Sequence, residues 1–282
     1  MNTQLRELQN IELDMLKTIL EIFEKRHINY YALGGTLLGC VRHKGFIPWD
    51  DDIDLGVPRP DYERFLAIAE KELPEHLRIV YYRTQKGEKR PIYMCQVQNT
   101  NVKIRQNIAN KPIETYAWVD IFPLDGMPDN SVLRKIHSFY LLYRRLRIQF
   151  SMFDENVHQF RTNRPWYEKA LIKFYRMTKI GSNSNPFEMM EKMDKALTKN
   201  DYEKCGWIIN FMGAWKLKEM FPKSVYGNGK MYPFEDIYLN APENSDFVLK
   251  QMYGDYMTPV QNMDEIENHH KMEIVQINER EK

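Results

Sequence analysis

Four aspartates stand within five positions of this chain: Asp50, Asp51, Asp52 and Asp54. Asp52 and Asp54 flank Ile53, and residues two apart in a β-strand point to the same face, so these two carboxylates would lie side by side. Carboxylates this close repel one another, and each raises the pKa of the other. A hard divalent cation removes that repulsion and accepts oxygen ligands. The pair therefore predicts a site for Mg²⁺ or Mn²⁺.

Two alternatives to a metal-binding pair are open. A solvated acidic loop would have polar neighbours, whereas the segment around the aspartates is apolar: Ile47, Pro48, Trp49, Ile53, Leu55 and Val57. Burial of unpaired carboxylates is costly and demands a counter-charge. A calcium loop of the EF-hand type requires glycine at its sixth position and glutamate at its twelfth, where this chain has Leu55 and Asp61. Both alternatives fit less well than a site for a hard cation.

A pair of glycines precedes the aspartates. Gly34 and Gly35, followed by Thr36, come after a short apolar segment (30–33) that we expect to be a strand and before a short expected helix (36–42). At such a junction, glycines let backbone N–H groups approach a phosphate, and the start of a helix adds partial positive charge. Thr36 would add a hydroxyl donor. A tight turn is the alternative, but the Asp-Ile-Asp segment that follows favours a phosphate site.

Three consecutive basic residues, Arg42, His43 and Lys44, lie between the glycines and the aspartates. Cationic side chains next to a metal site can neutralise the phosphates of a donor molecule. Any one of the three could equally well be an ordinary surface residue. They are candidates for donor binding.

Asp120 is the candidate for a third metal ligand. It lies within an otherwise apolar segment (118–122) that we expect to be a strand, where a charge needs a partner. Metal sites that handle polyphosphates commonly take one ligand from a second strand, whereas the alternative is a buried ion pair with an arginine. Asp125, which comes after Pro123, is expected to be a turn residue.

The elements that must position these residues mix helix and strand through residues 1–125. Apolar residues at spacings of three and four predict an amphipathic helix from Leu5 to about His27. Alternating residues at 92–98 and 102–106, separated by Asn99-Thr100-Asn101, predict a hairpin. Other strands are expected at 53–57, 78–82 and 117–122, the last ending at Pro123, and a helix at 61–73.

After residue 131 the pattern becomes helical, with short helices and loops from about 181. Residues 131–180 contain 11 Lys+Arg and 3 Asp+Glu. This excess of positive charge fits a solvated helix face, or a surface for a polyanionic acceptor or for anionic lipid headgroups. The composition shows no sharp boundary. We therefore expect a single domain over residues 1–282, with a catalytic core at 1–130 and a mainly helical region at 131–282 that completes the site.

Composition narrows the classes of function. The formal net charge is +1, which gives no argument for nucleic acid as a partner. The three cysteines, Cys40, Cys95 and Cys205, form no CxxC pair, so neither a zinc site nor a disulfide framework is expected. The N-terminal segment lacks the apolar core of a signal peptide, and the longest apolar stretch (207–215) is too short to span a bilayer. A cytoplasmic protein, in peripheral contact with the membrane at most, is expected.

With these residues in hand, the chain resembles the LicD family, the phosphocholine transferases of bacterial surface glycans. Its signature is similar to the run LGGTLLGCVRHKGFIPWDDDIDLGVPRPDYERF (33–65). Fukutin and fukutin-related protein, the eukaryotic ribitol-phosphate transferases, share that signature. The resemblance continues at WVDIFPLDG (118–126) and, more loosely, at 221–226, 234–242 and 253–259. Position 40 is cysteine where family members often have alanine, and no family motif is placed between 131 and 220.

The resemblance implies a fold, a donor and an acceptor. The fold would be an α/β, nucleotidyltransferase-like mixed sheet flanked by helices. The donor would be CDP-activated, usually CDP-choline, and the acceptor a hydroxyl of a glycan or lipid-linked glycan precursor of the cell surface, with release of CMP. The family's glycine pattern, its Asp-x-Asp motif and its later acidic residue carry over to Gly34, Gly35, Thr36, Asp52, Asp54 and Asp120.

A choline headgroup would require aromatic side chains around its quaternary ammonium group. Four residues are candidates for this role, each with simple core packing as the alternative: Trp49, Tyr93, Trp118 and Trp215.

Two other functions compete with phospho-alcohol transfer. The same fold and carboxylates could move a nucleoside monophosphate from a nucleoside triphosphate to a hydroxyl, with release of pyrophosphate. A non-catalytic protein that binds glycan or nucleotide would keep the fold but is expected to have lost one of the carboxylates. All three acidic positions are intact in this chain.

Overall fold

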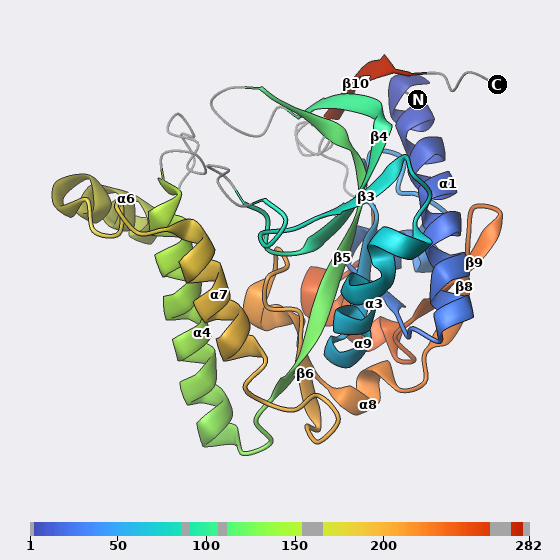
Figure 1. Ribbon diagram of the computed structural model, residues 1–282. Helices are drawn as coiled ribbons and strands as arrows, with labels where there is room; N and C mark the ends of the chain where they lie inside the picture. Colours follow the sequence, from blue (N-terminus) through green and yellow to red (C-terminus); the bar gives the residue numbers. More distant parts are fainter. Residues whose placement is uncertain (1–2, 86–90, 107–111, 154–165, 260–271, 279–282) are drawn as a thin grey trace.

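The structure is a computed structural model that describes residues 3–85, 91–106, 112–153, 166–259 and 272–278. A mixed sheet runs through the middle of the molecule, and α1 lies along one side of it (Figure 1). On the other side, α4 and α7 stand side by side and α6 lies at their upper end (Figure 1). The expected α/β fold with a mixed sheet flanked by helices is confirmed.

The main sheet has the order β1-β2-β5-β4-β10. In addition, β3 pairs with β4, and β6 pairs with both β5 and β7. β2 and β5 run parallel, and the other described pairs are antiparallel. The strands are β1 (Tyr31–Ala32), β2 (Asp54–Pro58), β3 (Leu77–Val80), β4 (Cys95–Gln106), β5 (Ile113–Met127), β6 (Trp207–Ile209), β7 (Met220–Pro222) and β10 (Met272–Ile277), with β8 (Lys230–Phe234) and β9 (Ile237–Ala241) forming a separate hairpin.

Helices surround this sheet. The described helices are α1 (Thr3–Arg26), α2 (Gly34–Leu38), α3 (Arg59–Glu72), α4 (Ser131–Ser151), α6 (Trp166–Thr178), α7 (Pro186–Leu197), α8 (Lys223–Tyr226) and α9 (Ser245–Tyr253), with a π-helical turn, η1 (Gly39–His43), and a 3₁₀ turn, η2 (Lys216–Glu219). The short helix expected at 36–42 is thus present and begins two residues earlier, at Gly34. It widens into the π-helical turn that carries Arg42 and His43.

The core lies around β2 and β5, which are buried along almost their whole paired length. Leu55 and Val57 of β2 and Val119 and Ile121 of β5 have no exposed surface. Strands covered by helices on both faces are apolar throughout rather than alternating. A carboxylate on either strand therefore stands out, and both Asp54 and Asp120 are such exceptions.

The predicted hairpin at 92–106 is wrong. β4 is one continuous strand from Cys95 to Gln106, and its pairing with β5 shifts register between Asn99 and Lys103. The Asn99-Thr100-Asn101 segment is a bulge that hydrogen bonds to its surroundings, since Thr100 donates its N–H to the carbonyl oxygen of His76. A bulge and a turn use the same polar residues, so only the neighbouring strands distinguish them.

The predicted end of a strand at Pro123 is also wrong, because β5 continues to Met127. Asp120 donates its N–H toward β2, so the N–H position of residue 123 points to the opposite side. On that side β4 begins only at Cys95, opposite Ile121. Pro123 therefore removes no hydrogen bond from the ladder, and it is tolerated inside the strand.

The C-terminal half is helical at first, as expected, with α4, α6 and α7. It also contributes strands that the sequence did not reveal: β6 extends the sheet beside β5, and β10 pairs with β4. Both halves of the chain thus build the main sheet. Within the described residues, no helix is long and apolar enough to cross a membrane.

Candidate active site and metal centre

The three predicted carboxylates converge. Asp54 opens β2 and is directly in register with Asp120 on the parallel strand β5. Asp52 lies just before β2, and each of the three residues offers a carboxylate oxygen within 4.8 Å of the other two. Asp120 is buried, whereas Asp52 and Asp54 are half-buried and accessible from one side. The geometry is that of a three-carboxylate site for a divalent cation.

The environment of Asp120 tests whether a cation fits. Its Oδ2 accepts a hydrogen bond of 2.9 Å from the indole N–H of Trp118. Its Oδ1 is buried and has no hydrogen-bond partner among the described atoms. Within the described residues, no salt bridge involves Asp120 or Asp54. A buried carboxylate oxygen without a partner is costly, and a bound cation would satisfy it.

Electrostatics agree with this interpretation. Burial raises the pKa of Asp54 well above its usual range, and the neighbouring carboxylates of Asp52 and Asp120 raise it further. Burial also raises the pKa of Asp120 to about 6, against the opposing effect of the Trp118 hydrogen bond. Without a cation the site is thus an unfavourable place for negative charge. A bound divalent cation would relieve the repulsion among these carboxylates.

The two glycines press against this cluster. A Cβ atom added to Gly34 would lie 2.9 Å from Oδ2 of Asp54, and one added to Gly35 would lie 2.3 Å from Oδ2 of Asp50. Gly34 also has a positive φ of 51°. Any side chain at either position would collide with a carboxylate. The glycines therefore allow the chain to pass directly beside the acidic side chains.

Thr36 has a role that sequence reasoning did not give it. Its hydroxyl oxygen accepts a 2.8 Å hydrogen bond from the backbone N–H of Asp54, and the residue is buried. Leu33 donates its N–H to the carbonyl oxygen of Asp54. These two bonds fix the backbone of Asp54 relative to the glycine turn.

The three basic residues predicted to bind the donor lie in different surroundings. Arg42 is half-buried and donates a 2.6 Å hydrogen bond to the carbonyl oxygen of Tyr256, in the 253–259 segment. His43 meets the ring of Trp49 edge-on at 6.4 Å. Lys44 is exposed and ends the π-helical turn with a φ of 59°. No described contact brings these three side chains, or Trp49, onto the carboxylates.

Comparison with known proteins identifies the family. The family model described as LicD/FKTN/FKRP, nucleotidyltransferase domain, matches residues 27–130. The lipopolysaccharide cholinephosphotransferase LicD of Haemophilus influenzae is 30% identical over 260 residues, covering 90% of this chain and 91% of that protein. Ribitol 5-phosphate transferase FKRP of Homo sapiens and of Mus musculus is 44% identical over 39 residues, or 14% of this chain and 8% of each relative.

This chain belongs to the LicD family. It is accordingly a phosphotransferase enzyme. The residues matched by the family model include the glycine turn and all three carboxylates, so the geometric cluster and the family's nucleotidyltransferase domain coincide.

A fourth acidic residue of this LicD-family enzyme escaped sequence reasoning. Glu12 lies on α1, outside the matched segment; it is buried, and its Oε2 has no hydrogen-bond partner among the described atoms. Burial raises its pKa well above the usual range, and Asp52 and Asp51 raise it further. One turn earlier, Gln9 donates a hydrogen bond of 2.9 Å to the carbonyl oxygen of Asp50. A signal existed: Glu12 interrupts the apolar stripe of the helix.

The C-terminal region contributes a group of aromatic and acidic residues. Glu219 is buried and accepts hydrogen bonds from the side chain of Asn210 and the backbone N–H of Trp215. Burial raises the pKa of Glu219 to about 7. The ring of Trp215 meets Tyr253 edge-on at 5.4 Å. Burial raises the pKa of Tyr253, and the charges on Asp54 and Asp50 raise it further.

The other aromatic candidates have structural roles. Tyr93 is buried and donates its hydroxyl to Asp194, and Trp118 holds Asp120. Trp49 is half-buried against His43. Among the four candidates for contact with a choline headgroup, Trp215 is the exposed one, with Tyr253 as its neighbour.

A second acidic cluster lies at the other end of the paired strands. Arg59, directly after β2, donates two hydrogen bonds to the carboxylate of Asp125, at 2.6 and 2.9 Å. The same guanidinium donates to Asp194 on α7 at 3.1 Å, and Arg83 donates to the other oxygen of Asp194 at 2.9 Å. Asp125 is thus not the predicted turn residue but a buried member of β5. This network attaches α7 to the sheet.

Proposed function

We propose that this LicD-family enzyme transfers phosphocholine from CDP-choline to a hydroxyl of a lipopolysaccharide or another cell-surface glycan precursor, and that it depends on Mg²⁺ or Mn²⁺. The observation that carries the proposal is the convergence of Asp52, Asp54 and Asp120, whose oxygens approach within 4.8 Å, with one oxygen of Asp120 buried and unsatisfied. Membership of a family with a named cholinephosphotransferase supplies the reaction class.

The residues of the chain would divide the work as follows. Asp52, Asp54 and Asp120 hold the cation, which when bound neutralises the diphosphate of the donor. The glycine turn lets the diphosphate approach the same edge of the sheet, and Thr36 keeps Asp54 in place. Positioning and charge neutralisation provide most of the catalysis in transfers of this kind.

The bond changes follow from this arrangement. The acceptor hydroxyl attacks the phosphorus that carries choline, in line with the bond to the cytidylyl oxygen. That bond breaks and CMP leaves. The hydroxyl proton passes to a carboxylate of the cluster, for which Asp54 and Asp120 are the candidates.

The choice of choline as the headgroup has support of its own. A quaternary ammonium group is stabilised by aromatic rings, with a gain of about 0.5–2 kcal/mol per good contact. Trp215 and Tyr253 form an edge-on pair, and Trp215 is exposed. Ribitol or glycerol phosphate would gain much less from such a pair.

The acceptor implies a location for the reaction. Lipopolysaccharide is anchored by lipid, so an enzyme that modifies it or its precursor must work next to a membrane. The proposal therefore includes peripheral contact through the basic 131–180 region, from the cytoplasmic side.

The test measures CMP release from CDP-choline with purified protein. Asp52→Asn, Asp54→Asn and Asp120→Asn should each abolish CMP release without loss of the fold, and EDTA should do the same until Mg²⁺ is returned. Asp14→Asn, an exposed aspartate on α1, is the matched control and should keep full activity. Full turnover by any of the three variants would reject the metal-site proposal.

Two further measurements separate the competing functions. Release of pyrophosphate from a nucleoside triphosphate, instead of CMP from CDP-choline, would identify a nucleotidyltransferase. Thermal-shift measurements with CDP-choline, CDP-ribitol and CDP-glycerol in the presence of Mg²⁺ rank the donors, because the true donor raises the melting temperature most at a given concentration.

A further inference from the structure

The outward face of α4 is apolar although nothing described covers it. Four residues at helical spacing share this face, and Phe139 and Ile136 expose 72% and 61% of their surface: Val132, Ile136, Phe139 and Tyr143. The opposite face of α4 is buried through Leu141 and Ile148. A helix that is apolar on both faces is usually buried on both. The outward stripe of α4 therefore has the character of a contact surface.

The neighbouring helix α6 has the same character. Trp166 exposes 80% of its surface and Met177 exposes 76%, and Leu171 and Phe174 are exposed between them. On an adjacent arc of the helix stand exposed basic residues: Lys169, Lys173 and Arg176. α6 is attached to the end of α4 through the packed rings of Phe150, Phe153 and Tyr175. Apolar and basic arcs side by side are typical of a helix that lies in the surface of a membrane.

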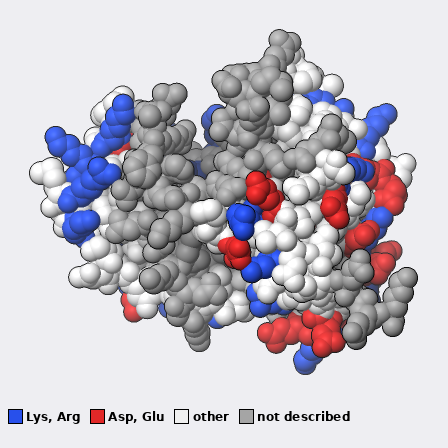
Figure 2. Space-filling view, turned by 90° about the horizontal axis from the view of Figure 1, so that it is seen from above, with Lys and Arg blue, Asp and Glu red and all other residues white. Residues whose placement is uncertain are grey.

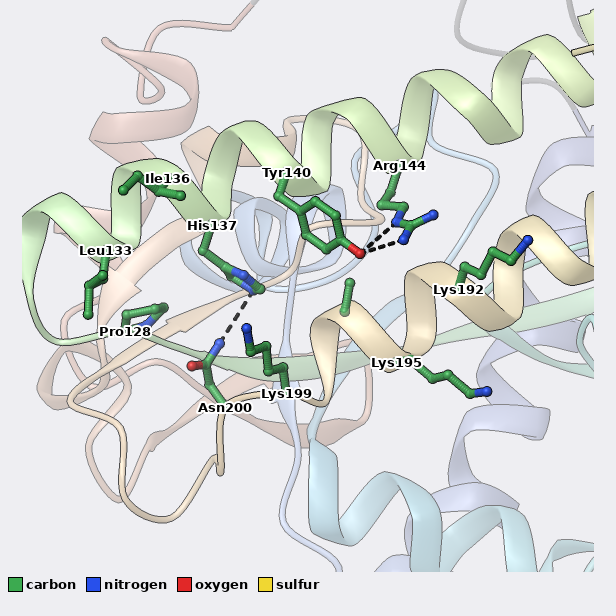
Figure 3. Close-up of a pocket in the computed structure, with 11 residues that line it drawn as sticks. Pro128, Leu133, Ile136, His137, Tyr140, Arg144, Lys192, Lys195, Lys199 and Asn200 are labelled. Carbon is green, nitrogen blue, oxygen red and sulfur yellow. Dashed lines mark hydrogen bonds between the residues drawn. The ribbon is translucent and has the colours of Figure 1, made fainter.

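Between α4 and α7 runs a groove of about 660 Å³ with two unlike walls. Leu133, Ile136 and Tyr140 of α4 line one side of the groove, and Lys192, Lys195 and Lys199 from α7 and its end line the other. The ammonium group of Lys195 is directed away from α4 (Figure 3). Arg144 also lines the groove, with its guanidinium on the hydroxyl of Tyr140 (Figure 3). Apolar groups next to a row of ammonium groups match a molecule that is a hydrocarbon at one end and an anion at the other.

Charge distribution over the surface supports the same partner. Figure 2 shows Lys and Arg side chains with few visible Asp or Glu on the side of the molecule that carries α6, whereas the opposite side shows both signs of charge intermixed. Among the described salt bridges, Lys195 and Lys199 take part in none, and Lys192 reaches Glu188 only at 3.8 Å. These cations are therefore free to meet external anions.

We propose that α4, α6 and α7 form a docking surface for a bilayer that contains anionic lipids. The exposed apolar side chains of α4 and α6 enter the boundary between headgroups and acyl chains, and the lysines and arginines meet the lipid phosphates. A second copy of the chain fits this surface poorly, because a symmetric contact would bring the same lysines of both copies together. The proposal does not depend on the identity of the donor or on the metal site.

The experiment is flotation of the full-length protein with vesicles of phosphatidylcholine alone or mixed with phosphatidylglycerol. We expect binding to the mixed vesicles, little binding to phosphatidylcholine alone, and a decrease as salt is raised, because salt screens the attraction to lipid phosphates. Phe139→Asp should reduce binding by about tenfold or more, since the side chain no longer leaves water. The triple change Lys192→Gln, Lys195→Gln and Lys199→Gln should reduce binding by about tenfold or more through lost charge.

Tyr238→Asp is the matched control. It replaces an aromatic residue that exposes 64% of its surface on β9, away from the proposed surface, and should leave vesicle binding unchanged. Far-UV circular dichroism, the melting temperature and CMP release with a water-soluble acceptor verify that each variant is folded. Equal binding of Phe139→Asp and the native chain would overturn the proposal. So would a concentration-dependent dimer that Phe139→Asp disrupts in the absence of vesicle binding, because the surface would then belong to a second copy.

Discussion

The two acidic clusters on β2 and β5 differ in their described ion pairs. At one end, Asp52, Asp54 and Asp120 meet with no described arginine or lysine in an ion pair with Asp54 or Asp120. At the other end, Asp125 and Asp194 receive the guanidinium of Arg59. The contrast teaches that burial of aspartate alone does not identify a catalytic site. What distinguishes the proposed site is that neither Asp54 nor Asp120 has a described ion pair, which is where we propose an external cation.

The largest effect is expected when a carboxylate is removed from the cluster of Asp52, Asp54 and Asp120. Asp54→Asn and Asp120→Asn should each lower the rate of CMP release by about 10²–10³-fold or more, the scale of losing a charge-stabilising group in a transfer site. The melting temperature without metal should stay the same or rise, because each change relieves repulsion among buried carboxylates. A large fall in melting temperature would show that the cluster is structural instead.

A second substitution tests the cluster in which Arg59 is paired with Asp125 and Asp194. Arg59→Met should destabilise the protein by about 3–5 kcal/mol, since it leaves Asp125 and Asp194 buried without their cation. Chemical denaturation measures this loss. Lys250→Gln breaks an exposed pair with Asp246 on α9 and should cost less than about 1 kcal/mol. An equally small loss for Arg59→Met would contradict the structural role assigned to the network.

The dependence of stability on pH tests the electrostatics of the cluster that contains Asp120. The pKa of Asp120 rises from 3.8 to about 6 on folding without metal, so the folded state holds its proton more tightly than the unfolded chain. This contribution to stability is fully present below about pH 4 and is lost as the pH rises through about 6. Mg²⁺ competes with that proton, so its stabilising effect should be larger at pH 8 than at pH 5. Melting curves at both pH values, with Mg²⁺ and with EDTA, provide the measurement; a Mg²⁺ shift that is larger at pH 5 would contradict this interpretation.

The smallest expected effect concerns Glu12. Glu12→Gln removes a buried acidic group that stands among like charges, so the metal-free melting temperature should rise by a few degrees, on the order of 1 kcal/mol. Asp14→Asn, two residues further along α1 and exposed, should leave it unchanged. A calorimetric titration of both variants with Mn²⁺ also shows whether Glu12 contributes to cation affinity. Destabilisation by Glu12→Gln would indicate that the acid has a bonding partner.

Much of the acidic cluster could be predicted from sequence, because spacing and immediate neighbours in the chain were sufficient to identify its residues. The two-residue spacing of Asp52 and Asp54 and the apolar surroundings of Asp120 were enough to predict that they converge. The fold class also followed, from alternation of helix and strand patterns and from the resemblance to the LicD family.

The errors arose where a residue's role is set by a distant part of the chain. Asn99-Thr100-Asn101 forms a bulge because β3 and β5 already flank β4, and Pro123 stays in β5 because β4 has begun too late to need its N–H. Asp125 is a strand residue because Arg59 reaches it across the sheet. Glu12 is close to the aspartates only because Gln9 and its helix pack on the loop that carries them. None of these pairings is visible from neighbours in sequence.

The spacing of Asp120 and Asp125 on β5 has an evolutionary consequence. An odd interval places the two carboxylates on opposite faces of one strand, so a single strand contributes to the three-aspartate cluster on one side and anchors a helix on the other. Insertion or deletion of one residue within this interval would turn one of the two acids to the wrong side, and no single substitution could restore both. The interval of five residues between Asp120 and Asp125 is therefore expected to be constant in LicD relatives that keep both acids.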